Sequence, residues 1–514
     1  MPLLVGLDIG TTAVKAGIYE STGRAVAVAG QEYRITHPAP DRAELDAETY
    51  WTATVTAIRR AMGAASVDPA SVASLAVSSQ GETVVAVDAH GRPLGPAIVW
   101  LDNRAVAEAG ELAGQFGDDE IYRRTGVPSI TPTWTACKLL WWRRHEPELF
   151  AGARRFLLVE DYVLHRLTGR YVTDGGVQST SLLFDIRAGA WWDAMLDAVG
   201  VDPGQLPGIV RPGAVVGGLT SEAAEALGLP RSVQVVAGGM DQGAGAVGVG
   251  NISSGMISES TGGALTLQAS IDRHGGDPTG QTPVYVHSAP DRYLYCPVCP
   301  TGGLALTWFR DQFAVDLVAR AARAGSSAYD LLTELAAGVA PGADGLTMLP
   351  HLMGAFSPEY EPEARGAFYG FTLHHGRSHF VRAVLEAVAF MLRRNLELLA
   401  AAGAAATEIR SHGGGSRSPL WNQIKADACG LPVVTLEGDA AAVRGDAMIA
   451  GVAAGVFPDL EAACSAMVVV QDRYEPNQTA RGAYDDAYGR YIRLFDALRP
   501  LFSTRGLPLA DPIP

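Results

Sequence analysis

The chain has 514 residues, of which 48% are hydrophobic and 18% charged, a balance typical of a folded globular protein with two or more domains. Its formal net charge of −15 excludes a general nucleic-acid-binding surface, which would need a basic face. This charge leaves open a nucleotide ligand, which backbone amides and a metal ion can hold locally.

We expect neither a signal peptide nor a membrane-spanning segment. The start Met1-Pro2-Leu3 lacks a basic region and a cleavage site, and no apolar run reaches transmembrane length. Five cysteines are few for this length and fit a reducing compartment, so we expect a cytoplasmic protein. Cys296 and Cys299 have the spacing of a redox or zinc pair, but a zinc site needs two more ligands, so we interpret them as ordinary thiols.

The first stretch, residues 3–19, predicts a β-hairpin. Two apolar runs flank Gly10-Thr11-Thr12, and glycine and threonine suit a tight polar turn. Free backbone N–H groups at such a turn suit a phosphate chain, and Asp8 is placed to hold Mg²⁺ directly or through water. The stretch is neither a Walker A loop nor a dinucleotide fingerprint. A plain hairpin that ends in an aspartate remains the alternative.

Strands and helices then alternate. Residues 43–62 have helical spacing, residues 75–77 and 83–87 predict strands, and the apolar run 97–100 leads into Leu101-Asp102-Asn103-Arg104. Helices dominate residues 105–199, and one of them is predicted over 155–167. This order predicts an α/β protein.

Residues 232–250 predict a strand, a glycine turn and a small-residue helix that begins at Asp241. Asp241 alone fits a helix N-cap. The domain boundary is expected near Asn251. Residues 256–267 again read as strand, Thr/Gly turn and strand, which echoes the opening hairpin and predicts two similar domains that face a cleft.

The second half is mainly helical by its pattern. Thr301-Gly302-Gly303 precedes a helix, residues 380–399 form a long amphipathic helix, and His412 to Ser418 is a glycine-rich loop before a helix over 419–429. A buried helix is predicted over 440–454, in which Arg444 and Asp446 suggest an internal ion pair. A helical tail is expected from residue 478, with a loose end over 506–514.

Five short motifs occur in an order that resembles the FGGY family of carbohydrate kinases, which includes glycerol kinases and xylulokinases, within the actin-like ATPase superfold. The resemblance covers residues 3–456. The motifs are Asp8-Ile9-Gly10-Thr11-Thr12, Trp100-Leu101-Asp102-Asn103-Arg104, Gly238-Gly239-Met240-Asp241-Gln242, Ser260-Thr261-Gly262-Gly263, and Gly413-Gly414-Gly415-Ser416-Arg417-Ser418-Pro419-Leu420-Trp421.

The resemblance implies two ribonuclease-H-like domains that flank a catalytic cleft. It implies a sugar-binding and catalytic domain over 1–250, a nucleotide-binding domain over 251–456 and a helical tail over 457–514. ATP and Mg²⁺ are the implied cofactors, and the implied reaction is phosphoryl transfer to a sugar or polyol hydroxyl. Family kinases are often dimers, but the sequence shows no interface.

The resemblance also implies roles for single residues. Asp241 matches the catalytic base, and Asp8 matches the carboxylate on the metal side, so both are candidate metal ligands. Lys15 stands where glycerol kinases carry an arginine near the phosphates, with a solvated strand lysine as the alternative. The remaining nucleotide-site matches are Gly10, Thr11, Thr12, Thr261, Gly262, Gly302, Gly303, Gly414 and Gly415, with Ser418 or Asn422 at the adenine edge.

Sugar contacts are expected from six residues, because fixed donors and acceptors recognise hydroxyl groups. They are Gln80, Gly81, Glu82, Trp100, Asp102 and Gln242. The sequence departs from its relatives here. Glycerol kinases have Arg-Glu at Gly81-Glu82, and xylulokinases have Gln-Met-His at Gln80-Gly81-Glu82, so the substrate stays open.

The leading hypothesis is an ATP-dependent kinase of a small ketose, with a pentulose such as xylulose as the best candidate. A glycerol- or tetritol-type polyol kinase is one alternative. A non-catalytic ATP-binding sugar sensor is another. The presence of both Asp8 and Asp241 argues against the sensor, because simple binding would need only the glycine turns.

Overall fold

The computed structural model describes residues 2–274, 277, 279–438 and 440–502. The chain folds into two units that interleave in sequence. Unit 1 comprises Met1–Ser254, Ser270–Tyr295 and Ala440–Val469, and unit 2 comprises Gly255–Ala269, Cys296–Asp439 and Val470–Pro514. The three-part division predicted from the sequence is contiguous, whereas here the segment 440–469 returns to unit 1. The predicted loose end over 506–514 lies outside the described residues.

A mixed sheet forms the centre of unit 1. Its strand order is β13(Val215–Gly218)-β14(Gln234–Met240)-β5(Val72–Ser79)-β1(Leu3–Ile9)-β2(Ala13–Glu20)-β3(Ala25–Glu32). β1, β2 and β3 pair antiparallel, and β5 pairs parallel with both β1 and β14. The opening hairpin is therefore confirmed. The strand predicted at 75–77 extends over the whole of β5.

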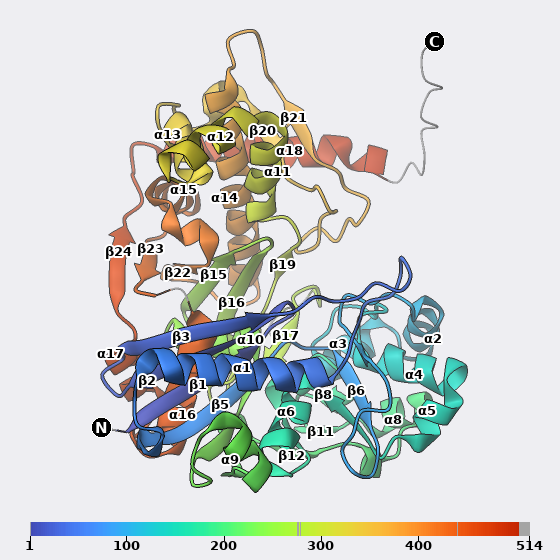
Figure 1. Ribbon diagram of the computed structural model, residues 1–514. Helices are drawn as coiled ribbons and strands as arrows, with labels where there is room; N and C mark the ends of the chain where they lie inside the picture. The colour runs from blue at the N-terminus through green and yellow to red at the C-terminus, as the bar shows by residue number, and fades with distance from the viewer. Residues whose placement is uncertain (1, 275–276, 278, 439, 503–514) are drawn as a thin grey trace. The chain divides into compact units, whose positions relative to one another are not determined.

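Helices cover both faces of this sheet (Figure 1). Alternate residues of β1, such as Val5 and Leu7, pack with α1(Glu48–Ala65), α6(Val159–Thr168) and α9(Ser221–Leu227). Leu4 faces the opposite way and packs with α16(Ala441–Ala453). This alternation follows from the two-residue period of a strand. It places Asp8, which shares a face with Leu4, on the α16 side.

α16 packs against α10(Asp241–Gly248) through small residues. A Cβ atom on Gly445 would lie 1.8 Å from Ala244 O, and one on Gly248 would lie 1.8 Å from Ala441 O. Glycine is needed here because the helix backbones approach each other too closely for a side chain. The predicted ion pair between Arg444 and Asp446 is wrong. Arg444 instead donates a hydrogen bond to Gly248 O, and Asp446 accepts one from Ser78 Oγ.

The rest of unit 1 is largely helical, as predicted. A small sheet of β4(Glu44–Leu45), β7(Ala97–Ile98), β6(Val84–Val87) and β8(Arg155–Leu158) packs with the helices α2(Val106–Phe116), α4(Thr135–His145) and α8(Asp193–Val199). The helix predicted over 155–167 was wrong at its start, because residues 155–158 pair with β6 as a strand. The shorter elements are α3(Asp118–Thr125), α5(Pro147–Gly152), β9(Val172–Asp174), α7(Gly175–Gln178), β10(Phe184–Asp185), β11(Ala190–Trp191), β12(Gly208–Val210), β17(Val284–Val286), β18(Tyr293–Tyr295) and α17(Leu460–Met467).

Unit 2 repeats the opening pattern of unit 1. β15(Met256–Thr261) pairs antiparallel with β16(Leu265–Ile271) and parallel with β22(Glu408–His412), just as β1 pairs with β2 and β5. On the other side of β22 the sheet is extended by β23(Val433–Leu436), which pairs parallel with β22, and by β24(Val470–Tyr474), which pairs antiparallel with β23. β19(Val298–Cys299) pairs antiparallel with β16. The internal echo predicted from the sequence is thus confirmed at the level of strand pairing.

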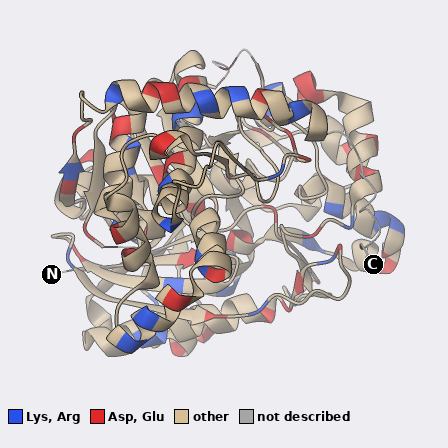
Figure 2. Cartoon of the chain, turned by 90° about the horizontal axis from the view of Figure 1, so that it is seen from above, with Lys and Arg blue, Asp and Glu red and all other residues tan. Residues whose placement is uncertain are grey.

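The helices of unit 2 are α11(Gly303–Phe313), α12(Val315–Ala324), α13(Ala328–Ala337), α14(Arg377–Ala401), α15(Pro419–Cys429) and α18(Arg481–Phe502), with the short pair β20(Thr347–Leu349) and β21(Ala367–Tyr369). α14 is buried along most of its length and packs against α15. Helices seen in Figure 2 carry residues of both charge signs. Cys296 and Cys299 are buried free thiols.

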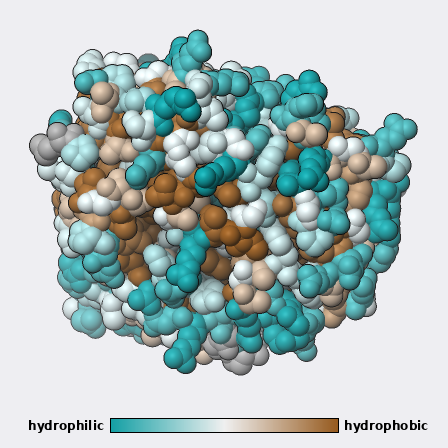
Figure 3. Space-filling model, turned by 90° about the horizontal axis from the view of Figure 1, so that it is seen from below, coloured by the Kyte–Doolittle hydropathy of each residue, from teal (hydrophilic) through white to brown (hydrophobic). Residues whose placement is uncertain are grey.

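None of the described helices is long and apolar enough to cross a membrane. On the face shown in Figure 3, hydrophilic residues dominate and hydrophobic groups show mainly in the hollows between them.

Candidate active site

Asp8 and Asp241 converge at one edge of the sheet in unit 1. β1 and β14 flank β5 on its two sides, and Asp8 and Gly239 are both paired with Ser78. Burial, followed by the charges of Asp8 and Glu82, raises the pKa of Asp241 to about 8. Because the charges of Asp8 and Glu82 act on Asp241, these three carboxyl groups lie near one another, as in an acid–base site.

Asp241 is the first residue of α10, and Met240 is the N-cap. The interpretation of Asp241 as a plain N-cap is therefore wrong. Its side chain is partly accessible, and the N-terminal end of the helix favours its anionic form. Gln242, the next residue of α10, hydrogen-bonds with the Asp241 side chain.

The surroundings of the Asp8 carboxylate suit a ligand of a divalent cation. Among the described residues, none hydrogen-bonds to its buried Oδ1 atom. Burial raises the pKa of Asp8 to about 6, against the opposing charge of Lys15, its partner across the hairpin. An unpaired buried carboxylate oxygen is what a hard divalent cation would bind. Lys15 itself is exposed.

The turn Gly10–Thr12 is tied down from its own unit. Gly10 N donates to Ala13 O at 3.0 Å, and the Tyr33 hydroxyl donates to Gly10 O. Thr11 Oγ1 accepts from Trp100 Nε1 at 2.8 Å. Two predicted groups, the turn and Trp100, are thereby brought into direct contact.

Two buried acids hold the chain just before Asp241. Glu160 Oε1 accepts from Gly238 N and Gly239 N at 3.0 Å each, and Asp174 lies beneath Gly239, 3.4 Å from where a Cβ would stand. Gly239 has φ +91°, which favours glycine. Burial, then the charges of Asp174 and Asp161, raises the pKa of Glu160 well above its usual range. This acid pair fixes the bend in β14 that aims Asp241.

Three predicted sugar residues, Gln80, Gly81 and Glu82, follow β5. Gln80 Nε2 donates to the Tyr50 hydroxyl at 3.1 Å, which leaves its buried Oε1 without a partner among the described residues. Glu82 has φ +54° and its carbonyl accepts from Lys138 Nζ at 3.1 Å. Burial raises the pKa of Glu82, and the charge of Lys138 opposes this rise. Gly81 has no room for a side chain, since a Cβ would lie 2.5 Å from Thr180 Oγ1.

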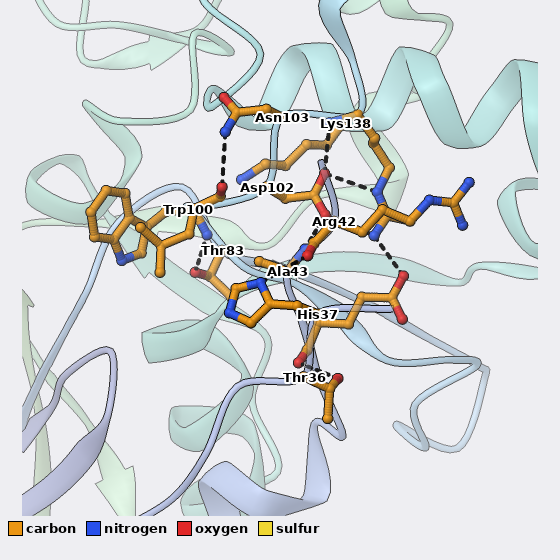
Figure 4. Close-up of polar contacts among 12 residues, drawn as sticks. Thr36, His37, Arg42, Ala43, Thr83, Trp100, Asp102, Asn103 and Lys138 are labelled. Carbon is orange, nitrogen blue, oxygen red and sulfur yellow. Dashed lines mark hydrogen bonds and ion pairs between the residues drawn. The ribbon is translucent and has the colours of Figure 1, made fainter. Parts of the chain in front are cut away.

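Asp102 differs from the other predicted sugar contacts. Its side chain is fully buried, and its carboxylate accepts from Ala43 N at 2.7 Å (Figure 4). The same carboxylate forms an ion pair with Arg104 at 2.8 Å. Protein groups therefore already occupy both carboxylate oxygens. This geometry favours a supporting role for Asp102, which anchors the segment after Trp100 to the chain at Ala43.

The predicted nucleotide residues of unit 2 surround a cavity of about 320 Å³. Thr261, Gly262, Gly303, Gly414, Gly415 and Ser418 line it. Gly302 lies behind this wall, where its N–H donates to Gly263 O at 2.8 Å. Ser418 caps α15 by accepting from Trp421 N. Asn422 is buried, donates to Ser416 O and is not among the lining residues of the cavity.

Sequence reasoning missed one wall of this cavity. Ser327, Tyr329, Asp330 and Thr333 come from α13 and its N-cap, and Leu306 and Thr307 come from α11. The Tyr329 hydroxyl is held by Thr307 and Arg310. Residues 327–333 carry no glycine motif or unusual spacing, so only the packing of α13 reveals them.

A buried charged network lies behind the Thr261 turn. Lys425 Nζ is 2.6 Å from Glu259 Oε1 and donates to Thr261 Oγ1 at 2.9 Å, and both charged side chains are fully buried. The Thr261 hydroxyl in turn donates to Glu259 Oε2 at 2.7 Å. Burial disfavours the Glu259 anion, but Lys425 holds the pKa of Glu259 below its usual range. The hydroxyl of Thr261 is therefore fixed from two sides.

Comparison with known proteins identifies the class. Residues 3–248 match the N-terminal domain, and residues 277–454 the C-terminal domain, of the FGGY family of carbohydrate kinases. The chain belongs to this family. The resemblance noted in the sequence and the fold of two actin-like ATPase domains are confirmed.

The chain is similar to several individual sugar kinases. A xylulose kinase of Escherichia coli (strain K12) is 30% identical over 502 residues, which cover 98% of this chain and all of the relative. A gluconokinase of Bacillus subtilis (strain 168) is 28% identical over 494 residues, covering 96% of this chain and 95% of the relative. A ligand-bound xylulose kinase structure from Lactobacillus acidophilus matches with a TM-score of 0.89 at 25% identity, covering 97% of this chain and 98% of that one.

Proposed function

We propose that this protein transfers the γ-phosphoryl group of ATP to a hydroxyl group of a small ketose, with a pentulose such as xylulose as the best candidate. The observation that carries the proposal is the convergence of Asp8 and Asp241 at one sheet edge, in a chain whose other unit holds a nucleotide-sized cavity lined by glycines. Xylulose kinases among the relatives support the choice of sugar.

The proposed chemistry uses Asp241 as general base. The Asp241 carboxylate accepts the proton of the sugar hydroxyl while that oxygen bonds to the γ-phosphorus, and the bond from the γ-phosphorus to the leaving oxygen breaks to give ADP. Glu160, through Gly238 and Gly239, holds Asp241 in place for this step.

Mg²⁺ would be held by Asp8 and Asp241, and when bound it would neutralise charge on the phosphates. The nucleotide would lie against the glycines of unit 2, and the turn Gly10–Thr12 with Lys15 would approach its phosphates. The segments 1–250 and 251–456 would thus carry sugar and nucleotide respectively, with 457–514 as a tail.

A neutral sugar suits the site better than an aldonate such as gluconate. The charges of Asp8 and Glu82 already disfavour the Asp241 anion, and the two nearby lysines each offset one of the other carboxylates, Lys15 that of Asp8 and Lys138 that of Glu82. A further carboxylate would add a like charge. The polyol kinase remains the second candidate, since Glu82 also occurs in the Arg-Glu pattern of glycerol kinases.

The test is Asp241→Asn, measured as ADP release with xylulose and as binding of ADP. We expect the turnover rate to fall by a factor of about 10²–10⁴, since this is the usual contribution of a general base, with ADP affinity unchanged. Asp193→Asn is the matched control, because Asp193 is also the first residue of a helix and is exposed. Near wild-type turnover in Asp241→Asn would remove Asp241 from this role.

A further inference from the structure

Besides the nucleotide cavity of unit 2, the structure has a large hollow in unit 1 that plays no part in the proposed chemistry. It encloses about 1030 Å³ and is lined by the β10–β11 turn, the end of β12, residues 272–274 and the β17–β18 hairpin. None of the residues predicted to bind sugar, nucleotide or metal lines it. Its size is enough for a small organic ligand.

The charged residues of this hollow are mainly arginines. Arg187, Arg211, Arg273 and Arg292 line it, against two aspartates, Asp272 and Asp291. Asp272 is committed, because it forms an ion pair with Arg292. In a chain of net charge −15, a local excess of positive charge is a departure from the rest of the molecule.

Once Asp272 has paired with Arg292, three guanidinium groups face a single remaining carboxylate in the lining, that of Asp291. Arg187, Arg211 and Arg273 are exposed and form no ion pair with any residue in the described part of the chain. The two histidines of the hollow add no charge: burial, then the charge of Arg187, lowers the pKa of His274, and burial lowers the pKa of His287 to about 4. The hollow thus presents three guanidinium groups that form no ion pair within the described residues.

We propose that this hollow binds a small phosphorylated metabolite that carries two or more negative charges, at a site separate from the catalytic one. Guanidinium groups bind phosphate oxygens in pairs of parallel hydrogen bonds, and neighbouring guanidinium groups repel one another until an anion lies between them. Tyr293, whose hydroxyl donates to Ile186 O, gives the recess an aromatic wall.

The floor of the hollow leads to the catalytic strand. His287 lines the hollow, and its neighbour Ser288 donates from Oγ to Gly238 O at 2.7 Å. Val286, also in the lining, donates from N to Ser179 Oγ at 2.9 Å. Ser179 is the C-cap of α7, the helix whose N-cap is Asp174. A ligand that moves β17 would therefore act on the backbone that holds Asp241.

The test is titration calorimetry with inorganic pyrophosphate on the full chain, without Mg²⁺ and with ADP in excess so that the nucleotide site is filled. We expect one binding event per chain, weakened at least tenfold in Arg187→Gln/Arg211→Gln. The control is Arg320→Gln/Arg323→Gln, which removes two exposed charges from α12 and should leave the affinity within twofold.

Several results would overturn the proposal. They are no binding by the wild-type chain, equal binding by Arg187→Gln/Arg211→Gln and wild type, and tighter binding of citrate than of pyrophosphate, which would indicate a carboxylate site. A wild-type thermal unfolding profile of the double variant shows that unit 1, which holds the hollow, is folded. Because turnover is not measured, failure here is distinct from failure of the proposed kinase activity.

Discussion

Lys425 is predicted to contribute several kcal/mol to the free energy of unfolding of unit 2, although it does not line the cavity. Lys425→Met leaves Glu259 fully buried without its partner at 2.6 Å. Breaking a buried ion pair from one side costs about 3–5 kcal/mol, whereas replacing both members by apolar residues is often neutral or stabilising. We therefore expect Lys425→Met to lose about 4 kcal/mol in its free energy of unfolding. The double variant Lys425→Met/Glu259→Leu should recover most of this loss.

The assay is urea unfolding of the four members of a double-mutant cycle. Arg377–Asp316, an exposed pair on α14 and α12 at 2.8 Å, supplies the control cycle, with an expected coupling of less than about 1 kcal/mol. A coupling as small for Lys425–Glu259 would refute the reasoning.

Nucleotide affinity adds a second readout to this cycle. Thr261 loses both of its hydroxyl partners in the double variant, so the turn that lines the cavity should loosen even where stability is regained. We expect ADP to bind about tenfold more weakly, corresponding to one hydrogen bond to a charged group. Wild-type ADP affinity in a stable double variant would show that Lys425 has no part in ordering the turn.

Three further predictions concern packing, pH and the cavity wall. Gly445→Ala should cost about 1–3 kcal/mol of stability, because its Cβ would lie 1.8 Å from Ala244 O. Gly245→Ala is the control: its Cβ would have no atom within 4 Å, so the change in stability should be at most about 1 kcal/mol. Equal thermal stabilities of the two variants would contradict this prediction. Burial lowers the pKa of His351 to about 4, below its value in the unfolded chain, so the unfolded chain binds one more proton as the pH falls. From pH 7 to pH 5 the wild type should therefore lose about 2 kcal/mol more stability than His351→Gln. Parallel stability profiles of the two proteins would contradict this pKa shift. Tyr329→Ala should weaken ADP binding about tenfold, with little change in kcat at saturating ATP, and unchanged affinity would remove α13 from the site.

Local patterns in the sequence were enough for the elements that carry the turns. The hairpin around Gly10, the strand-to-helix junction at Asp241 and the helix over 419–429 each have turn residues between periodic apolar runs, and the structure confirms all three. Such features depend on neighbouring residues and are visible without tertiary information.

The supporting residues could not be predicted in the same way. Glu160 reaches Gly238 only because α6 and β14 are neighbours in space, and Lys425 meets Glu259 across 166 positions of sequence. The return of residues 440–469 to unit 1 has the same origin, since it depends on the packing of α16 against α10. The hydrogen bond from Ala43 N to Asp102 spans 59 positions of sequence, so the motif that predicts a sugar contact for Asp102 did not reveal this partner.

The measurement that tests the central claim most directly is ADP release by the wild-type chain with ATP and Mg²⁺ across xylulose, other ketoses, gluconate and glycerol. We predict that a ketose stimulates ADP release strongly, xylulose above the others, and that Asp241→Asn abolishes the stimulation. ADP release that no sugar or polyol increases would contradict the kinase assignment and favour an ATP-binding sensor.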